Sequence, residues 1–201
     1  MCSSDLWAKV AVSTRAWAGL NPKAMFRDPI TVQDVFDSRI ISYPFHLLEC
    51  CLVTDGGGAI IMTTAERAKD LKGKPAYILG TGEEITHKDI SSMPDFTKTG
   101  AIQSGQRAYT AAGLSASDVD VATLYDAFTI CTLLFLEDLG FCEKGEGGAF
   151  VADGGIAPGG RFPVNTNGGG LSYCHPGMYG LLVLIEAARQ IQGVCGPRQV
   201  D

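Results

Sequence analysis

One of the three histidines in this 201-residue chain lies in a segment whose neighbours favour chemistry. The segment reads NTNGGGLSYCHPGMYG over residues 165–180 and contains His175. Three adjacent glycines have no Cβ, so the backbone there can approach a ligand closely. Pro176 fixes one backbone angle directly after the histidine and restricts where the imidazole points. A lone loop histidine is more often a structural hydrogen-bonder than a base, so this pattern alone leaves both roles open.

The residues that follow predict a helix over 181–191. Its apolar residues recur on one face, at positions 181, 184, 185, 188 and 191. A histidine beside a helix N-terminus lies near a partial positive charge, which disfavours the imidazolium form. We therefore expect His175 to be a neutral imidazole that can accept a proton near pH 7.

The same segment resembles the histidine-bearing catalytic loop of the thiolase superfamily, Asn-x-x-Gly-Gly-x-x-x-x-x-His-Pro, and within it the relatives of sterol-carrier-protein thiolases. The matching positions are Asn165, Gly168, Gly169, His175 and Pro176. The family glycine three residues after the histidine is out of register, because this chain has Gly177 and Gly180 instead. The resemblance implies that His175 is a catalytic base held, directly or through a water, by Asn165. It also implies substrate contacts at Gly168, Gly169, Gly170 and Pro176.

A second segment reads LYDAFTI over residues 124–130. It resembles the thiolase Asn-Glu-Ala-Phe or His-Asp-x-Phe motif, which implies an oxyanion-hole donor at Tyr125 and an acyl or pantetheine channel at Phe128. Tyrosine departs from the family here, since a phenol is a longer donor and far less acidic than imidazolium. It can still polarise a thioester oxygen. Without the resemblance, both aromatics would be interpreted as core residues.

The resemblance covers roughly residues 15–200 and implies an α/β fold, a thiolase-like mixed sheet between helix layers that is incomplete in this chain. Residues 1–64 would be the end of the N-terminal domain, and residues 65–201 most of a truncated C-terminal domain. The first six residues match nothing in the family, and we interpret them as non-native sequence from a sequencing adapter.

Local patterns predict elements consistent with this layout. The predicted strands cover 59–63, 76–79 and 119–123, and the predicted helices cover 65–72, 103–112 and 127–139. Residues 145–170 contain too many glycines for regular structure, so we expect a functional loop there.

In the thiolase family, making or breaking a carbon–carbon bond needs a cysteine nucleophile on the first half of the protein, outside the segment matched here. The resemblance implies that this cysteine attacks an acyl-CoA thioester after His175 accepts its proton, with Tyr125 as donor to the thioester oxygen. Acyl-CoA is then the substrate, no cofactor is required, and the full-length protein is a homodimer. Cys174 is an alternative nucleophile, although sequence neighbours often point in different directions. We expect the chain by itself to be inactive.

Two other functions remain open. Thiolase-like aldolases of steroid side-chain degradation lack the cysteine and use tyrosines for retro-aldol cleavage, a role open here to Tyr125, Tyr173 and Tyr179. Retention of His175 argues against this alternative. The other is a non-catalytic acyl-CoA-binding subunit that pairs with a small OB-fold partner.

Composition excludes several function classes. The net charge of −6, with scattered basic residues, argues against binding to nucleic acid or to an anionic membrane. No apolar run approaches the ~20 residues of a membrane span. Seven cysteines form no CxxC pair, which favours free thiols in a reducing cytoplasm. His46 lies near Cys50 and Cys51, but adjacent cysteines rarely bind one zinc, so we expect no metal site.

Overall fold

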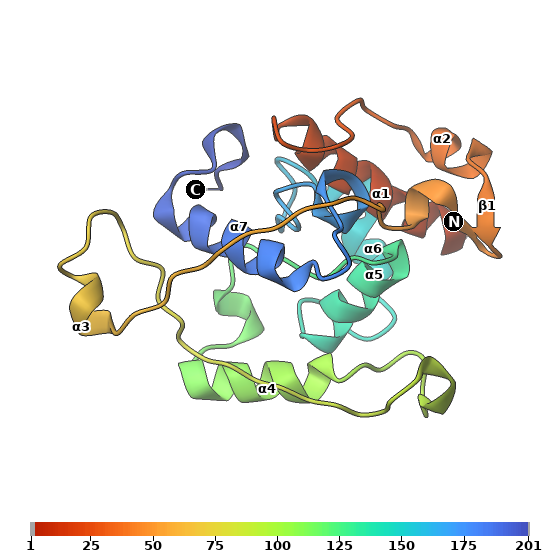
Figure 1. The fold of residues 1–201 in the computed structure, drawn as a ribbon. Coiled ribbons are helices and arrows are strands. Elements are labelled where there is room, and N and C mark those ends of the chain that lie inside the picture. Colours follow the sequence, from red (N-terminus) through yellow and green to blue (C-terminus); the bar gives the residue numbers. More distant parts are fainter. Residues whose placement is uncertain (1–2, 201) are drawn as a thin grey trace.

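The computed structural model describes residues 3–200, which form a helix-rich body with one small sheet (Figure 1). Its α-helices are α1 (Ser3–Gly19), α2 (Val32–Asp37), α3 (Ala65–Ala68), α4 (Ala101–Ala112), α5 (Thr129–Asp138), α6 (Gly147–Val151) and α7 (Gly180–Gln192). Short 3₁₀ turns cover Leu47–Glu49, Ile90–Ser92, Ala116–Asp118, Ala152–Gly154 and Gly196–Arg198, and Gly169–Tyr173 is a π-turn. Strands β1 (Ile40–Ser42) and β2 (Phe45–His46) pair antiparallel.

The main hydrophobic core lies where α1, α5 and α6 meet. Its buried members are Val10, Ala122, Leu124, Leu133, Leu136, Val151, Ile156, Phe162, Val164 and Leu171. A fully buried leucine such as Leu136 contributes about 1.5–3 kcal/mol through the hydrophobic effect. Trp17 anchors the C-terminal part of α1, because its indole N–H donates to the carbonyl of Ile156 at 2.9 Å. This core holds α1 beside the π-turn that contains Gly169 and Gly170.

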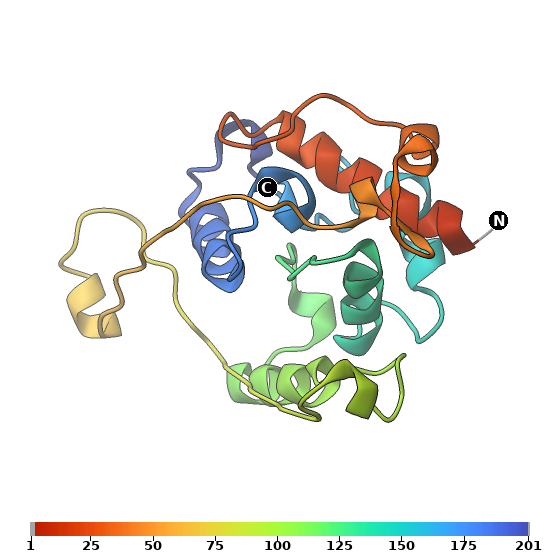
Figure 2. The same ribbon diagram turned by 45° about the vertical axis from the view of Figure 1, so that its right-hand side comes forward.

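The predicted strands at 59–63 and 76–79 do not form. Both segments belong to a long extended stretch that leaves the body, carries α3 well apart from it and returns along α4 (Figures 1 and 2). A strand is stabilised by its ladder partners, and within residues 3–200 no segment pairs with either stretch. The predicted strand at 119–123 is reduced to one parallel bridge between Ala122 and Val164.

Helix α7 forms where the apolar pattern predicts it and ends at Gly193, whose φ of 74° suits a glycine cap. Its orientation is unexpected. Leu184 is 59% exposed, whereas Glu186 and Gln190 are buried. The helix turns this polar face inward because buried partners from other segments satisfy it.

The other predicted helices form with altered limits. The helix expected at 103–112 is α4, the one at 127–139 is the shorter α5, and the one at 65–72 is the single-turn α3. The glycine-rich stretch 145–170 is not a plain loop, since it contains α6 and a 3₁₀ turn. Residues 3–6 continue into α1.

Candidate active site

Three segments distant in sequence converge on one site, and backbone hydrogen bonds join them. Residues 50–55 form a strap that runs between the Tyr-Asp-Ala-Phe motif and the glycine turn. The N–H of Cys51 donates to the carbonyl of Ala127, and the N–H of Leu52 donates to that of Gly170, both at 2.9 Å. The strap therefore fixes the distance between the two motifs.

The imidazole of His175 lies between two tyrosines. Its ring meets Tyr125 edge-on, with centroids 5.5 Å apart and planes at 85°, and stacks on Tyr179 at 6.0 Å and 20°. The backbone N–H of His175 donates to Thr54 Oγ1 at 2.9 Å. Its Nε2 is buried and has no hydrogen-bond partner among the described residues. A buried ring nitrogen that lacks a protein partner can accept a hydrogen bond from a substrate hydroxyl or from a water.

The hydroxyl of Tyr125 ties the histidine loop together. It donates to the carbonyl of Gly177 at 3.0 Å and accepts from the N–H of Tyr179 at 3.3 Å. A phenol hydroxyl has one hydrogen to donate, and here that hydrogen is donated to a backbone carbonyl of the protein. The role of Tyr125 as a donor to a thioester oxygen remains a prediction, and it requires this bond to Gly177 to break.

Tyr179 is fully buried, and Asn167 holds it. Its hydroxyl donates to Asn167 Oδ1 at 2.8 Å, and the same oxygen accepts the N–H of Gly169 at 2.9 Å. Burial is the main reason why the pKa of Tyr179 is raised well above that of a free phenol. Tyr179 had appeared only in the lyase alternative, and Asn167 had not been predicted at all. Asn167 lies two residues after Asn165, and no motif at that position indicates a role for it.

The glycine triplet allows close approach of protein groups, and whether it also contacts a substrate stays a prediction. A Cβ at Gly168 would stand 2.6 Å from the Cβ of Ala18, and a Cβ at Gly169 would collide with Asp126 Oδ2. Gly168 and Gly169 also have φ of 102° and 62°, values that L side chains rarely adopt. Only glycine therefore fits where α1 and the second motif press against the turn.

Asn165 is buried at the start of this turn with a φ of 52°. Its Oδ1 accepts the N–H of Leu124 at 2.7 Å, which joins the turn to the second motif. Its Nδ2 has no hydrogen-bond partner among residues 3–200. The structure thus uses Asn165 to hold the backbone, and its predicted hold on the histidine or a water stays a prediction.

Asp126 is a central residue that the sequence analysis left without a role. Its side chain is fully buried, and Oδ1 accepts the N–H of Gly170 at 2.7 Å. Oδ2 has no hydrogen-bond partner within the described chain. Burial raises the pKa of Asp126 to about 7, against the lowering effect of the N–H of Gly170. The feature of the sequence that could have indicated a role for Asp126 is its position as an acidic residue among the mostly apolar and aromatic residues 124–130.

The thiol of Cys174 is hydrogen-bonded to the strap and not to the imidazole of His175. Its sulfur accepts from Thr54 Oγ1 at 3.3 Å and lies 3.5 Å from the carbonyl oxygen of Asp55. No group of three or more metal-ligating side chains occurs within residues 3–200. His46 instead contacts the carbonyl of Ser38 through Nδ1 at 2.7 Å.

The remaining predicted residues lie around this centre. Phe128 is 41% exposed and packs against Phe45, with ring centroids 5.6 Å apart. Pro176 lies next to Gly56, the residue that directly follows the strap. Tyr173 is half-buried in the π-turn, and burial is the main cause of its raised pKa. Whether Phe128 and Pro176 contact a substrate stays a prediction.

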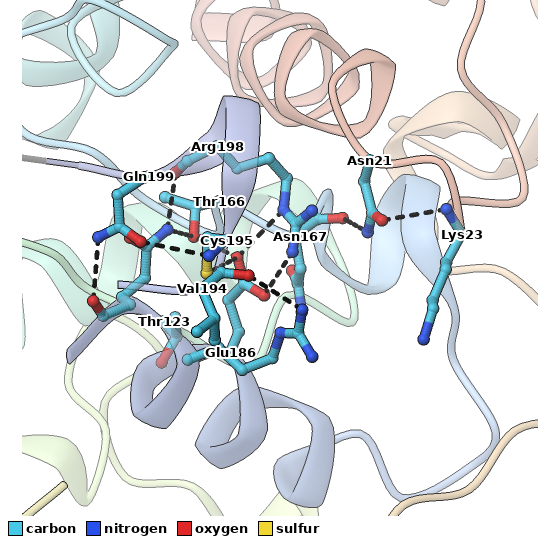
Figure 3. Close-up of polar contacts among 12 residues, drawn as sticks. Asn21, Lys23, Thr123, Thr166, Asn167, Glu186, Val194, Cys195, Arg198 and Gln199 are labelled. Atoms are coloured by element: carbon cyan, nitrogen blue, oxygen red, sulfur yellow. Dashed lines mark hydrogen bonds and ion pairs between the residues drawn. The ribbon is translucent and has the colours of Figure 1, made fainter. Parts of the chain in front are cut away.

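A buried polar network holds the residues that directly precede the glycine turn (Figure 3). Glu186 of α7 pairs with Arg198 at 3.0 Å and accepts the hydroxyl of Thr166 at 2.7 Å. Gln190 donates to the same threonine hydroxyl at 2.9 Å. Thr166 directly precedes Asn167, whose carbonyl accepts from the side chain of Asn21, just after the end of α1, at 2.7 Å. The inward polar face of α7 thereby fixes the segment that carries the site.

Comparison with known proteins identifies the class. Residues 82–201 match the family described as Thiolase C-terminal domain-like, and the chain belongs to this family. A solved structure described as an Ltp2-ChsH2(DUF35) aldolase matches the whole chain with a TM-score of 0.92 and 38% identity, and the match covers 53% of that structure's chain. The predicted thiolase-like α/β class is therefore confirmed.

Two relatives show which members of the family this chain resembles. The chain is 41% identical over 202 residues to the steroid side-chain-cleaving aldolase of Thermomonospora curvata, a match that covers 95% of this chain and 50% of that protein. It is 42% identical over 195 residues to the 17-hydroxy-3-oxo-4-pregnene-20-carboxyl-CoA lyase of Mycobacterium tuberculosis, covering 92% and 49%. The chain thus spans about half the length of these relatives. Both are named for cleavage, which favours the aldolase alternative over the acyl-transfer prediction.

No helix within residues 3–200 is both long and apolar enough to cross a bilayer.

Proposed function

We propose that the whole protein to which this chain belongs is a thiolase-like lyase. Its substrate is a CoA thioester on a steroid side chain with a hydroxyl on the β-carbon, and its reaction is a retro-aldol cleavage. The site supports this through a buried imidazole nitrogen that has no hydrogen-bond partner among residues 3–200 and is flanked by two tyrosines. The similarity to a steroid side-chain-cleaving aldolase and to a 17-hydroxy-3-oxo-4-pregnene-20-carboxyl-CoA lyase supports the substrate class.

The reaction needs one proton acceptor and no cofactor. Nε2 of His175 takes the proton of the β-hydroxyl. The oxygen then forms a ketone, the carbon–carbon bond breaks, and its electron pair enters the enolate of the thioester. The enolate α-carbon takes the proton back from the imidazolium. The products are a ketosteroid and a shortened acyl-CoA, so atoms and charge balance.

The rigidity of the site supports general-base catalysis. Thr54 holds the backbone of His175, and Tyr125 ties the loop closed at Gly177. A base held in this way loses little entropy on reaching its reactive position. Acyl transfer has less support from Cys174, because its sulfur accepts a hydrogen bond from the strap.

The test is an assay of the full-length protein, obtained with its upstream coding sequence. A steroid β-hydroxyacyl-CoA thioester is supplied, and the ketone and acyl-CoA products are separated by chromatography and identified by mass. The assay is run with and without a small OB-fold partner protein, which we propose as the accessory subunit. We expect cleavage in the full-length protein and none with residues 1–201 alone.

His175→Gln should lower the cleavage rate about 10²–10⁴-fold, the usual contribution of a general base. His87→Gln is the matched control, because His87 contacts Thr86 and lies in another segment. Thiolysis of acetoacetyl-CoA without aldol cleavage would instead establish an acyltransferase. Binding of CoA thioesters without either reaction would establish a non-catalytic subunit.

A further inference from the structure

Asp126 and His175 approach the same glycine from two segments. A Cβ on Gly170 would stand 2.8 Å from His175 Cδ2 and 3.2 Å from Asp126 Oδ1. Both side chains also carry a buried polar atom, His175 Nε2 and Asp126 Oδ2, that has no hydrogen-bond partner among residues 3–200. The side chains of the buried Asp126 and the half-buried His175 therefore both lie next to Gly170, where no side chain stands between them.

The neighbours of Asp126 do not balance a negative charge. Cys51 faces it from the strap, Cys131 from α5 and Tyr179 from the start of α7. Burial raises the pKa of each of these three groups, and the charge on Asp126 raises each further. They are all neutral near pH 7. The N–H of Gly170, at 2.7 Å, is the first of several polar groups that favour the carboxylate; the others are the N–H groups of Asp126 and Leu171 and the side chain of Asn165.

We propose that Asp126 is a positioning residue that acts through His175, its carboxylate facing the imidazole across Gly170 and stabilising the imidazolium that forms when substrate gives up its proton. This rests on the proposed role of His175 as the base. In a dry interior, opposite charges interact far more strongly than in water, and a preformed partner needs no rearrangement during the reaction.

A purely structural role is the competing explanation. In that case Asp126 only holds the backbone of Gly170, and its ionisation is independent of the histidine. The two explanations differ in one measurable respect. A charge partner of His175 must titrate at a different pH when the imidazole is removed, whereas a structural acid must not.

The first experiment measures that coupling without any substrate. Infrared spectra follow the carbonyl stretch of protonated aspartate, identified by ¹³C labelling, as pH rises through the pKa of Asp126, about 7. In His175→Gln no ring can take a positive charge beside the carboxylate, so the midpoint should move upward by about 0.5–1 pH unit. His87→Gln should leave it in place. An unchanged midpoint in His175→Gln overturns the proposal.

The second experiment uses the full-length enzyme and Asp126→Asn, which keeps an acceptor for the N–H of Gly170 but cannot ionise. In the unsubstituted enzyme, kcat/KM should fall on the acid side with a logarithmic slope of about two, because both groups must lose a proton. The slope should be about one in Asp126→Asn, with a rate about ten-fold lower at pH 8. Asp120→Asn, at an exposed position, is the control. A slope of about two in Asp126→Asn would contradict the proposal.

The two experiments separate the proposals. A midpoint shift in the infrared titration without aldol cleavage would retain the pairing of Asp126 with His175 and refute the lyase function. Cleavage without the shift would retain the lyase function and refute the pairing.

Discussion

The ring of Tyr179 stacks on the imidazole of His175, with centroids 6.0 Å apart and planes 20° from parallel. The other end of the same tyrosine is bound by Asn167, which also holds the glycine turn. The orientation of the histidine therefore depends on a buried amide eight residues before it in sequence.

Removing only the hydroxyl of Tyr179 tests this link. Tyr179→Phe loses the bond to Asn167 but keeps the stacked ring, so the free energy of unfolding should fall by about 0.5–1.5 kcal/mol. Urea unfolding measures the change. Tyr77→Phe, at a phenol that is 50% exposed, should have no effect. Equal stability of the two variants would mean that the bond contributes nothing.

Gly169→Ala separates collision from backbone strain when it is compared with Gly177→Ala. Both glycines have left-handed φ, 62° and 79°, so each alanine costs about 1–2 kcal/mol in strain. Only at Gly169 does the new Cβ also meet Asp126 Oδ2, while nothing lies within 4 Å of the Cβ at Gly177. We expect Gly169→Ala to be clearly the less stable in thermal unfolding. Similar melting temperatures would show that the turn can move away from Asp126.

The buried pair of Glu186 and Arg198 should respond asymmetrically to substitution. Glu186→Leu alone leaves a buried guanidinium without its partner and should cost about 3–5 kcal/mol. Adding Arg198→Met to Glu186→Leu should recover most of this loss, because no isolated charge then remains. A double-mutant cycle in urea measures the coupling. Additive losses would mean that the two charges do not interact.

Asp126 should make stability fall with rising pH. An unfolded aspartate releases its proton near pH 4, whereas burial holds the pKa of folded Asp126 at about 7. The folded state therefore binds more protons between these values, so the free energy of unfolding decreases from about pH 4 to about pH 7 and then levels.

The difference in unfolding free energy between the unsubstituted protein and Asp126→Asn isolates this term. It should shift in favour of the asparagine variant by up to a few kcal/mol across that pH range. A difference that stays constant from pH 4 to pH 8 would show that Asp126 ionises normally in the folded chain.

Thr54→Val should loosen the histidine loop. The substitution keeps the shape of the side chain but removes the oxygen that accepts the N–H of His175. Amide exchange at His175 should become faster, and stability should fall by about 1–3 kcal/mol if that N–H stays buried without a partner. Thr63→Val, at an exposed position of the same extended stretch, is the control. Unchanged exchange at His175 in Thr54→Val would show that the strap does not hold the backbone of His175.

Much of the helical structure could be predicted from local pattern. The helices α4, α5 and α7 follow from apolar residues recurring with helical spacing, and α4 and α7 end in left-handed glycines at 113 and 193. The His175 and Tyr125 motifs could also be predicted, because their residue types and spacing lie within short continuous segments.

Other features depended on partners distant in sequence. An apolar β-branched segment such as 59–63 becomes a strand only beside a partner strand, and within residues 3–200 it has none. The face that α7 buries was decided by Arg198 and Thr166, whose contacts with Glu186 outweigh the burial of Leu184. Spacing along the chain contains no information on such contacts.

The sequence by itself determined which residue types could do the chemistry and which segments would be helical, because both are local properties. Tertiary structure alone decided that Asp126 becomes a buried acid with a raised pKa and that the strap closes over His175. The physical reason is that desolvation and hydrogen-bond geometry depend on every neighbour in space, and folding sets those neighbours.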